Sequence, residues 1–390
     1  MMNRYSLALL GLISGFAFIF SNNAYSIPTT LPKSNSALQI SKEQCEEKHY
    51  LYATHPKSTF ISVMKIDPKT GNLIKQADVY TVVSPGDLHI LTLNNNKKYV
   101  YTFGNFDETL MVYSIESDGN LKNVQTEKIV GDLPFNISFD HDGNHMYLSN
   151  TLNDNISMFK VNRDNGKLIP MSPPTIPSYM PYPAGLNMNP NSPNFVYITD
   201  YQSNSVSLYR IDQLTHILIP LYKYYPTGFL PRLAWFDKKN HAYILNLSSN
   251  DISMFYANPQ TGDLTPLSTP TVATGVEPLT FVLSPSDKYA YVGTREDNSV
   301  HIYNKNERDG VLTPVENLPI VNTGGTGARN IVIDTYNNTS YLYVSNSYDS
   351  TITKFKLDSN GLIEPSTRTI NDTEMFNPEV IGVAALNNCN

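Results

Sequence analysis

Four ionisable side chains stand near the starts of short apolar segments of this chain. They are Arg232, Arg329, Glu379 and His89, and the first three directly follow a proline or, for Arg329, an alanine. Two guanidinium groups can bind one carboxylate through planar, paired N–H donors. A glutamate or histidine within hydrogen-bond reach can then move a proton. These residue types predict acid–base chemistry on a carboxylate-bearing substrate.

A structural role for the same residues stays open. The two arginines can neutralise carbonyl groups and Glu379, because buried charges are normally paired. A single histidine such as His89 is more often a hydrogen-bonded structural residue than a base, and His55 has the same two interpretations.

Other patterns predict neither a metal nor a cofactor. His141 and His145 are four residues apart, but they flank a predicted β-turn, where strand alternation does not bring them together. The stretch Gly324-Gly325-Thr326-Gly327 lacks the lysine and the following helix of a phosphate-binding loop. The sequence also lacks a Gly-x-Ser-x-Gly nucleophile motif.

The elements that must position these side chains are repeats. A tyrosine opening a short apolar strand recurs every 46 to 52 residues, at Tyr52, Tyr101, Tyr147, Tyr197, Tyr243, Tyr291 and Tyr343. A second strand of alternating apolar and polar residues follows, and then a turn that usually contains glycine. His216 replaces that glycine in one copy, so we expect a turn that is strained or differently shaped there.

Four strands in about 48 residues make one blade of a β-propeller. We therefore predict an all-β, seven-bladed β-propeller with four-stranded antiparallel blades, closed so that no sheet edge stays exposed. The C-terminal strand Glu379–Leu386 would complete the blade that begins near His49. The positions entering the innermost strands are predicted to be Leu88, Phe135, Ala184, Arg232, Leu279, Arg329 and Glu379.

In the blade that closes the ring, the first and second strands come from opposite ends of the chain, so no turn joins them. The two chain ends at this point carry the only cysteines of the chain. We predict a disulfide between Cys45 and Cys389 that locks this seam.

The N-terminus predicts export. Residues 1–26 have Arg4, an apolar run from Leu7 to Phe20, and Ala24 and Ser26 at the cleavage positions of a signal peptide. We expect residues 27–48 to be a lead-in, 49–390 the propeller, and the mature protein a monomer, periplasmic or secreted, without a transmembrane anchor. The net charge of −7 excludes a typical nucleic-acid binder.

The strands Tyr343-Val344-Ser345-Asn346 and Tyr291-Val292-Gly293-Thr294 resemble the YVTN-type repeat. The longer unit is similar to that of lactonase-type seven-bladed propellers, which include 6-phosphogluconolactonases and muconate-lactonising enzymes. In that family, channel-facing arginine, histidine and glutamate are implicated in acid–base work on a lactone, which points to Arg232, Arg329, Glu379 and His89. The His-Pro-His-type segment of many members is absent, and Pro85-Gly86-Asp87-Leu88-His89 occupies its region.

Three functions remain in competition at the level of sequence. The first is a propeller that binds a small ligand or a protein partner at its channel mouth. The second is a lactonase-like enzyme acting on a carboxylate-bearing lactone. The third is a structural protein of the cell envelope or surface.

Overall fold

The structure, a computed structural model, describes residues 47–94, 96–104, 107–129, 131–372 and 377–387. The segment predicted as signal peptide and both cysteines of the predicted disulfide lie outside these residues. Within them the chain forms strands and no helix. The described residues accordingly contain no helix of the length and apolarity that crossing a membrane requires.

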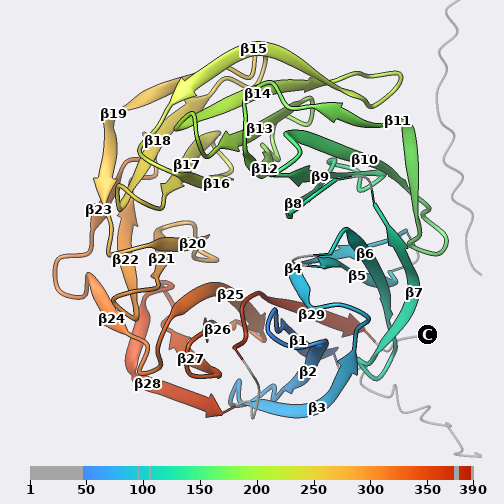
Figure 1. Cartoon of the computed structure of the whole chain (residues 1–390). Coiled ribbons are helices and arrows are strands. Elements are labelled where there is room, and N and C mark those ends of the chain that lie inside the picture. The colour runs from blue at the N-terminus through green and yellow to red at the C-terminus, as the bar shows by residue number, and fades with distance from the viewer. Residues whose placement is uncertain (1–46, 95, 105–106, 130, 373–376, 388–390) are drawn as a thin grey trace, which may run out of the picture. The chain divides into compact units, whose positions relative to one another are not determined.

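The strands form seven antiparallel sheets arranged as the blades of a ring (Figure 1). Blade 1 contains β29 (Ile381–Asn387), β1 (Glu47–Thr54), β2 (Phe60–Ile66) and β3 (Leu73–Tyr80). Blade 2 contains β4 (Pro85–Thr92), β5 (Lys98–Gly104), β6 (Thr109–Ile115) and β7 (Leu121–Lys128). Blade 3 contains β8 (Pro134–Phe139), β9 (His145–Asn150), β10 (Asn155–Val161) and β11 (Leu168–Pro177). Blade 4 contains β12 (Pro183–Met188), β13 (Phe195–Asp200), β14 (Ser205–Ile211) and β15 (Leu218–Pro226).

The remaining three blades follow the same order from the innermost strand outward. Blade 5 contains β16 (Pro231–Phe236), β17 (His241–Asn246), β18 (Asp251–Ala257) and β19 (Leu264–Ala273). Blade 6 contains β20 (Pro278–Leu283), β21 (Tyr289–Thr294), β22 (Ser299–Lys305), β23 (Leu312–Pro314) and β24 (Ile320–Asn322), the last two sharing the outer position. Blade 7 contains β25 (Ala328–Tyr336), β26 (Thr339–Asn346), β27 (Thr351–Leu357) and β28 (Ile363–Asp372).

The ring closes as the repeat phase predicted. The C-terminal strand β29 pairs antiparallel with β1, with Leu386 opposite Lys48 and Gly382 opposite Tyr52. One blade is therefore built from both ends of the chain, which confirms the predicted seven-bladed propeller.

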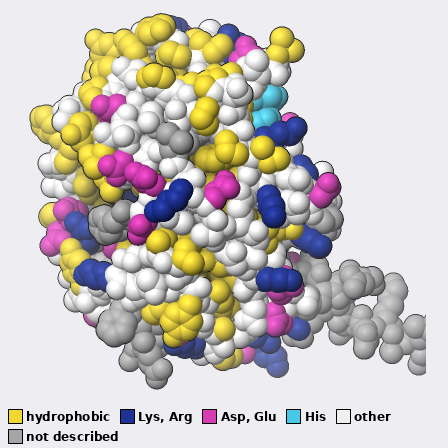
Figure 2. All heavy atoms as spheres, turned by 45° about the vertical axis from the view of Figure 1, so that its right-hand side comes forward, with side chains coloured by type: hydrophobic (Ala, Val, Ile, Leu, Met, Phe, Trp, Pro, Cys, Tyr) yellow, Lys and Arg dark blue, Asp and Glu magenta, His cyan; other side chains and the backbone are white. Residues whose placement is uncertain are grey.

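Apolar residues of neighbouring blades pack face to face. Between blades 2 and 3, for example, Tyr101 and Leu110 meet Ile137 and Leu148, and all four are fully buried. Alternation along each strand places one set of side chains on each face of its sheet, and both faces are covered by the adjacent blades. The face shown in Figure 2 presents neutral polar side chains, backbone and groups of hydrophobic side chains, with charged residues in small groups, in agreement with the low charged fraction of 16%.

The repeat tyrosine links each blade to the next. Six of these hydroxyls donate to a backbone carbonyl in the outer hairpin turn of the following blade, at 2.6–2.9 Å: Tyr52 to Gly119, Tyr101 to Gly166, Tyr147 to His216, Tyr197 to Gly262, Tyr243 to Gly310 and Tyr343 to Gly71. Burial raises the pKa of these hydroxyls, so they remain donors. The recurrence of tyrosine in the sequence is therefore explained by a hydrogen bond between blades.

The seventh tyrosine provides a matched control for the contribution of this hydrogen bond to the free energy of unfolding. The hydroxyl of Tyr291 is buried without a partner among the described residues. We expect Tyr243→Phe to lower the free energy of unfolding by about 1–2 kcal/mol, because it leaves the Gly310 carbonyl unpaired. Tyr291→Phe should change it little or raise it. Urea unfolding of both variants checks this, and equal losses would contradict the proposed contribution of the hydrogen bond.

The turn at His216 is strained as predicted. Its φ is 56°, in the left-handed region, whereas the equivalent turns of the other blades place glycine there: Gly71, Gly119, Gly166, Gly262, Gly310 and Gly361. A side chain in this conformation costs about 1–2 kcal/mol.

Candidate functional site

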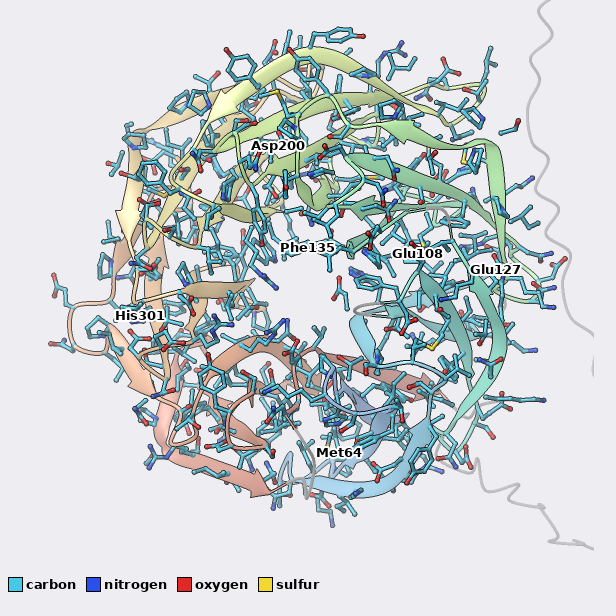
Figure 3. The ribbon with its side chains drawn as sticks, viewed as in Figure 1. Met64, Glu108, Glu127, Phe135, Asp200 and His301 are labelled. Carbon is cyan, nitrogen blue, oxygen red and sulfur yellow. The ribbon has the colours of Figure 1, made fainter. Side chains whose placement is uncertain are left out.

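The four residues singled out from the sequence line one cavity. It has a volume of about 610 Å³ and lies where the innermost strands of several blades converge. Arg232, Arg329, Glu379 and His89 come from blades 5, 7, 1 and 2 or the segments entering them, and all four contribute to its wall. Phe135, another predicted inner position, points toward the centre of the ring (Figure 3).

One predicted position was aligned wrongly. In β4 the pairing with β5 shifts between Pro85 and Leu88, so Leu88 lies opposite Thr102. Pro85 lies opposite Gly104 as Pro183 lies opposite Asp200, so Gly86 follows the proline in β4 as Ala184 does in β12. Leu88 lies two residues further along β4 and is a buried core residue.

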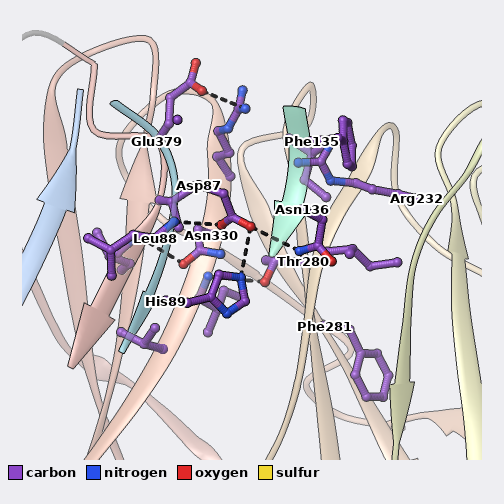
Figure 4. Close-up of a pocket in the computed structure, with 18 of the residues that line it drawn as sticks. Asp87, Leu88, His89, Phe135, Asn136, Arg232, Thr280, Phe281, Asn330 and Glu379 are labelled. Carbon is purple, nitrogen blue, oxygen red and sulfur yellow. Dashed lines mark hydrogen bonds and ion pairs between the residues drawn. The ribbon is translucent and has the colours of Figure 1, made fainter. Parts of the chain in front are cut away.

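An arginine–glutamate cluster forms one end of the cavity (Figure 4). Arg329 Nη2 lies 2.6 Å from Glu379 Oε2. The guanidinium of Arg232 lies over the ring of Phe135, 5.2 Å from its centroid, and interacts with the hydroxyl of Tyr201. Phe135 in turn packs edge-on against Tyr201, with 5.4 Å between ring centroids. An aromatic wall thus holds Arg232 beside the ion pair.

The cluster carries an excess of positive charge. Burial lowers the pKa of Arg329 to about 10; Glu379 raises it, while Arg232 and Arg295 lower it further. Arg329 therefore remains charged at neutral pH. The Nε atoms of Arg232 and Arg329 are both buried without a hydrogen-bond partner among the described residues. Among the described residues Glu379 pairs with Arg329, and no carboxylate pairs with Arg232, so the cluster favours an anionic ligand.

A carboxylate–histidine pair lies deeper in the same cavity. Asp87 Oδ2 is 3.0 Å from His89 Nε2 and accepts a hydrogen bond from Asn136 Nδ2 at 3.0 Å, while Asp87 Oδ1 accepts one from the Leu88 amide. Burial raises the pKa of Asp87, but the charge of His89 and these hydrogen bonds outweigh it and lower the pKa overall. Asp87 is therefore ionised, fixes the His89 ring and can stabilise its protonated form.

The sequence analysis missed Asp87. It occupies the second position after the proline, where Asn136, Thr280 and Asn330 stand in other blades. Those three side chains each accept a hydrogen bond from the backbone of the next blade, at Leu186, Ile331 and Ile381. In the sequence, a polar residue two positions after the proline is the pattern that indicates these hydrogen bonds between neighbouring blades. Asp87 is its charged member and the one that also contacts a histidine.

The rest of the cavity wall is largely apolar. Phe103, Trp235, Phe236 and Phe281 line it together with aliphatic residues. Phe281 stacks on Tyr243 and packs against Trp235, which fixes its ring. The cavity therefore combines charged groups at one end, a histidine further in and an apolar wall, as ligand sites typically do.

The other histidines considered in the sequence lie elsewhere. His55 is fully buried, 3.0 Å from Ser62 Oγ and packed on Phe60, which supports its structural interpretation. His141 is exposed on the β8–β9 turn, and His145 pairs with Asp140 rather than with His141. None of the three lines the cavity.

The chain is similar to lactonases in sequence. The family model described as "Lactonase, 7-bladed beta-propeller" matches residues 186–376. The 6-phosphogluconolactonase of Pectobacterium carotovorum is 28% identical over 163 residues, which cover 38% of this chain and 46% of that protein. That of Serratia proteamaculans is 22% identical over 318 residues, covering 80% and 79%. The chain thus spans about half the length of the first relative and most of the second.

Solved structures agree in fold. A putative 6-phosphogluconolactonase from Bacteroides fragilis superposes with a TM-score of 0.73 at 21% identity, over 87% of this chain and 98% of that one. The periplasmic gluconolactonase of Pseudomonas aeruginosa gives a TM-score of 0.74 at 18% identity, over 87% and 100%. With its repeats, its closed ring of blades and these matches, the chain is a seven-bladed β-propeller that is similar to lactonases over residues 186–376.

Proposed function

We propose that this protein hydrolyses an anionic lactone in the cavity described above. The observation that carries the proposal is the convergence of two arginines, one of them without a carboxylate partner among the described residues, and an Asp87–His89 pair on one partly apolar cavity. The sequence relatives, which are 6-phosphogluconolactonases, favour this interpretation over the propeller that only binds a ligand or partner. The export and the Cys45–Cys389 disulfide expected from the sequence remain part of the proposal.

The residues divide the work between binding and proton transfer. Arg232 and Arg329 bind the carboxylate or phosphate of the substrate, and Glu379 holds Arg329 in place. His89 Nε2 is engaged by Asp87, so Nδ1 is the atom that takes a proton from water. Figure 4 shows Glu379 and Arg232 at one end and His89 further in, which supports binding of the anionic group and of the reacting carbonyl at different points along the cavity.

The water oxygen attacks the lactone carbonyl carbon while its proton passes to His89. The ring C–O bond then breaks, and the proton on His89 passes to the departing alkoxide oxygen. The product is a hydroxy acid, which ionises in water. Asp87 compensates the positive charge of His89 between the two transfers.

The test is hydrolysis of charged and neutral lactones by the arginine variants. Suitable substrates are 6-phosphogluconolactone, muconolactone as a carboxylate, and uncharged gluconolactone. We expect Arg232→Ala or Arg329→Ala to raise KM for the charged substrate about 30- to 100-fold, because a hydrogen bond to a charged group contributes about 1.5–3 kcal/mol. The effect on the neutral lactone should be much smaller.

Two further variants separate binding from folding. Arg329→Lys keeps a positive charge beside Glu379 but loses the planar pair of donors, so it should fold normally and bind the anion weakly. Arg308→Ala removes an exposed arginine outside the cavity and should behave as wild type. Background rates for the wild-type protein on all three lactones would refute the proposal, and tight binding without turnover would favour the ligand-binding propeller.

A further inference from the structure

A second cluster of polar side chains lies at the boundary between blades 3 and 4, away from the cavity. Asp140 follows β8, His145 begins β9, and His216 lies in the β14–β15 turn of the next blade. One ligand atom from each lies within 4.8 Å of the other two. Asp140 Oδ2 is 2.7 Å from His145 Nδ1, and the two imidazoles stack with 4.0 Å between centroids.

Half of this cluster is a structural motif that the propeller uses twice. In blade 5, Asp237 Oδ2 lies 2.7 Å from His241 Nδ1 in the same way. There, Lys305 Nζ of blade 6 also lies 2.6 Å from Asp237 Oδ2. Gly310 packs directly on the His241 ring, because an added Cβ would meet that ring at 2.3 Å. An aspartate–histidine pair by itself therefore indicates no ligand.

The boundary between blades 3 and 4 differs from that arrangement at two positions. Ile211, the last residue of β14, stands where blade 6 has Lys305, the last residue of β22. Asp140 therefore lacks the lysine that Asp237 has. His216 stands where blade 6 has Gly310, and it adopts a left-handed φ of 56°. A lysine is thus replaced by an apolar residue, and a glycine by a strained second imidazole.

We propose that Asp140, His145 and His216 bind one divalent transition-metal ion of the zinc class. Two imidazoles and a carboxylate are ligands that such ions prefer, at about 2.0–2.2 Å from the metal. The ion supplies the positive charge that Lys305 provides beside Asp237 in the other motif. Metal binding also accounts for the strained backbone of His216. Water completes the coordination from an open hollow of about 580 Å³ that His145 and His216 line.

The stacked rings must tilt to bind the ion. Nitrogen lone pairs lie in the plane of each imidazole, and the two planes are within 15° of parallel. His216 is only half-buried on its turn, so its ring can rotate, and the ion would replace the proton shared between Asp140 Oδ2 and His145 Nδ1. The bound ion then joins blade 3 to blade 4 and stabilises the folded state by mass action.

Neighbouring positive charges set an upper limit on affinity. Lys160 and Arg163 line the same hollow and repel a cation. Arg163 is directed elsewhere, donating to the Gly143 carbonyl and to Asn94 Oδ1, both at 2.9 Å. Lys160 is exposed, so water and salt screen it. The site is therefore expected to be exchangeable, unlike a buried structural zinc site.

The decisive variant is His216→Gly, which restores the residue that the other blades use and removes the backbone strain. Titration calorimetry of the untagged, metal-free protein with ZnCl2 should show one ion bound per chain. We expect His216→Gly to weaken binding at least 20-fold while the metal-free protein is as stable as wild type or more stable. Zinc should raise the melting temperature of the wild type and not that of the variant. Co2+ should give the visible absorption of a four-coordinate site in the wild type alone.

Two controls exclude other histidines. His141→Ala changes an exposed histidine one residue from Asp140 and should leave zinc affinity unchanged. His89→Ala should also retain it, which separates this site from the lactone cavity. Equal zinc affinity in wild type and His216→Gly would overturn the proposal, and so would a loss of binding in His89→Ala.

Discussion

Replacing His89 by alanine is expected to lower kcat for lactone hydrolysis about 1000-fold. General acid–base catalysis by one side chain contributes about 10²–10⁴ in rate. His89 is the histidine that lines the cavity, and an ionised carboxylate at 3.0 Å orients it. KM should change little, because the arginines proposed to bind the anion are at the other end of the cavity (Figure 4). Steady-state kinetics on the preferred lactone checks both parameters.

A catalytic role can be separated from a structural one at this position. Imidazole added to His89→Ala should restore part of kcat, because the substitution leaves space beside Asp87 for the lost ring. His141→Ala, at an exposed turn, should keep full activity. A His89→Ala enzyme that folds and retains more than a third of wild-type kcat would show that His89 is structural and would leave Glu379 as the remaining base from the sequence analysis.

Asp200→Asn is expected to stabilise the protein by up to about 4 kcal/mol at pH 8. Asp200 is fully buried at the end of β13 and is paired with the hydroxyl of Ser207. At the same point of blades 3, 5 and 7 the chain has Asn150, Asn246 and Asn346, each donating to a serine or threonine seven residues later. An asparagine in blade 4 should make the same bond and carries no charge to bury.

The size of this effect follows from the ionisation of Asp200. Burial raises its pKa from 3.8 to about 7, although the hydrogen bond from Ser207 opposes the shift. Between these values the folded carboxyl holds a proton that the unfolded one has lost, so wild-type stability falls as pH rises and levels off above about 7. Each pKa unit corresponds to about 1.4 kcal/mol.

The pH dependence provides the control for this prediction. At pH 5 most of the penalty is absent, so the gain from Asp200→Asn should be about 3 kcal/mol smaller than at pH 8. Urea unfolding at both pH values measures it. An equal gain at the two pH values, or a less stable variant at pH 8, would show that Asp200 is not a buried, protonated acid.

The repeats allowed most of the fold to be predicted, because they record local requirements. The repeat tyrosine marks a hydrogen bond between blades, and the turn glycine marks a left-handed residue. The out-of-phase termini predicted that β29 would pair with β1. The alignment failed at Leu88, which lies two residues beyond Gly86, because a shift of two residues leaves the alternation of the strand unchanged.

The site could be predicted only in part for a related reason. Arg232, Arg329 and Glu379 share a position in the repeat, so finding the blade was enough to place them on the channel. Asp87 was not predicted, because its proposed role in the site depends on its contacts with His89 and with Asn136 of another blade. His216 was recognised as a strained turn, but nothing in its own segment predicts the stacked ring of His145, 71 positions earlier in the chain.

The sequence by itself determined the architecture: seven blades, a ring closed by the C-terminal strand, and an inner position for two arginines and a glutamate. These features follow from periodicity, which is a property of neighbouring residues along the chain. Only the tertiary structure decided which charges meet. The Arg329–Glu379 pair, the Asp87–Asn136 hydrogen bond and the Asp140–His145–His216 cluster each join two blades, and such contacts depend on side-chain geometry across blade boundaries.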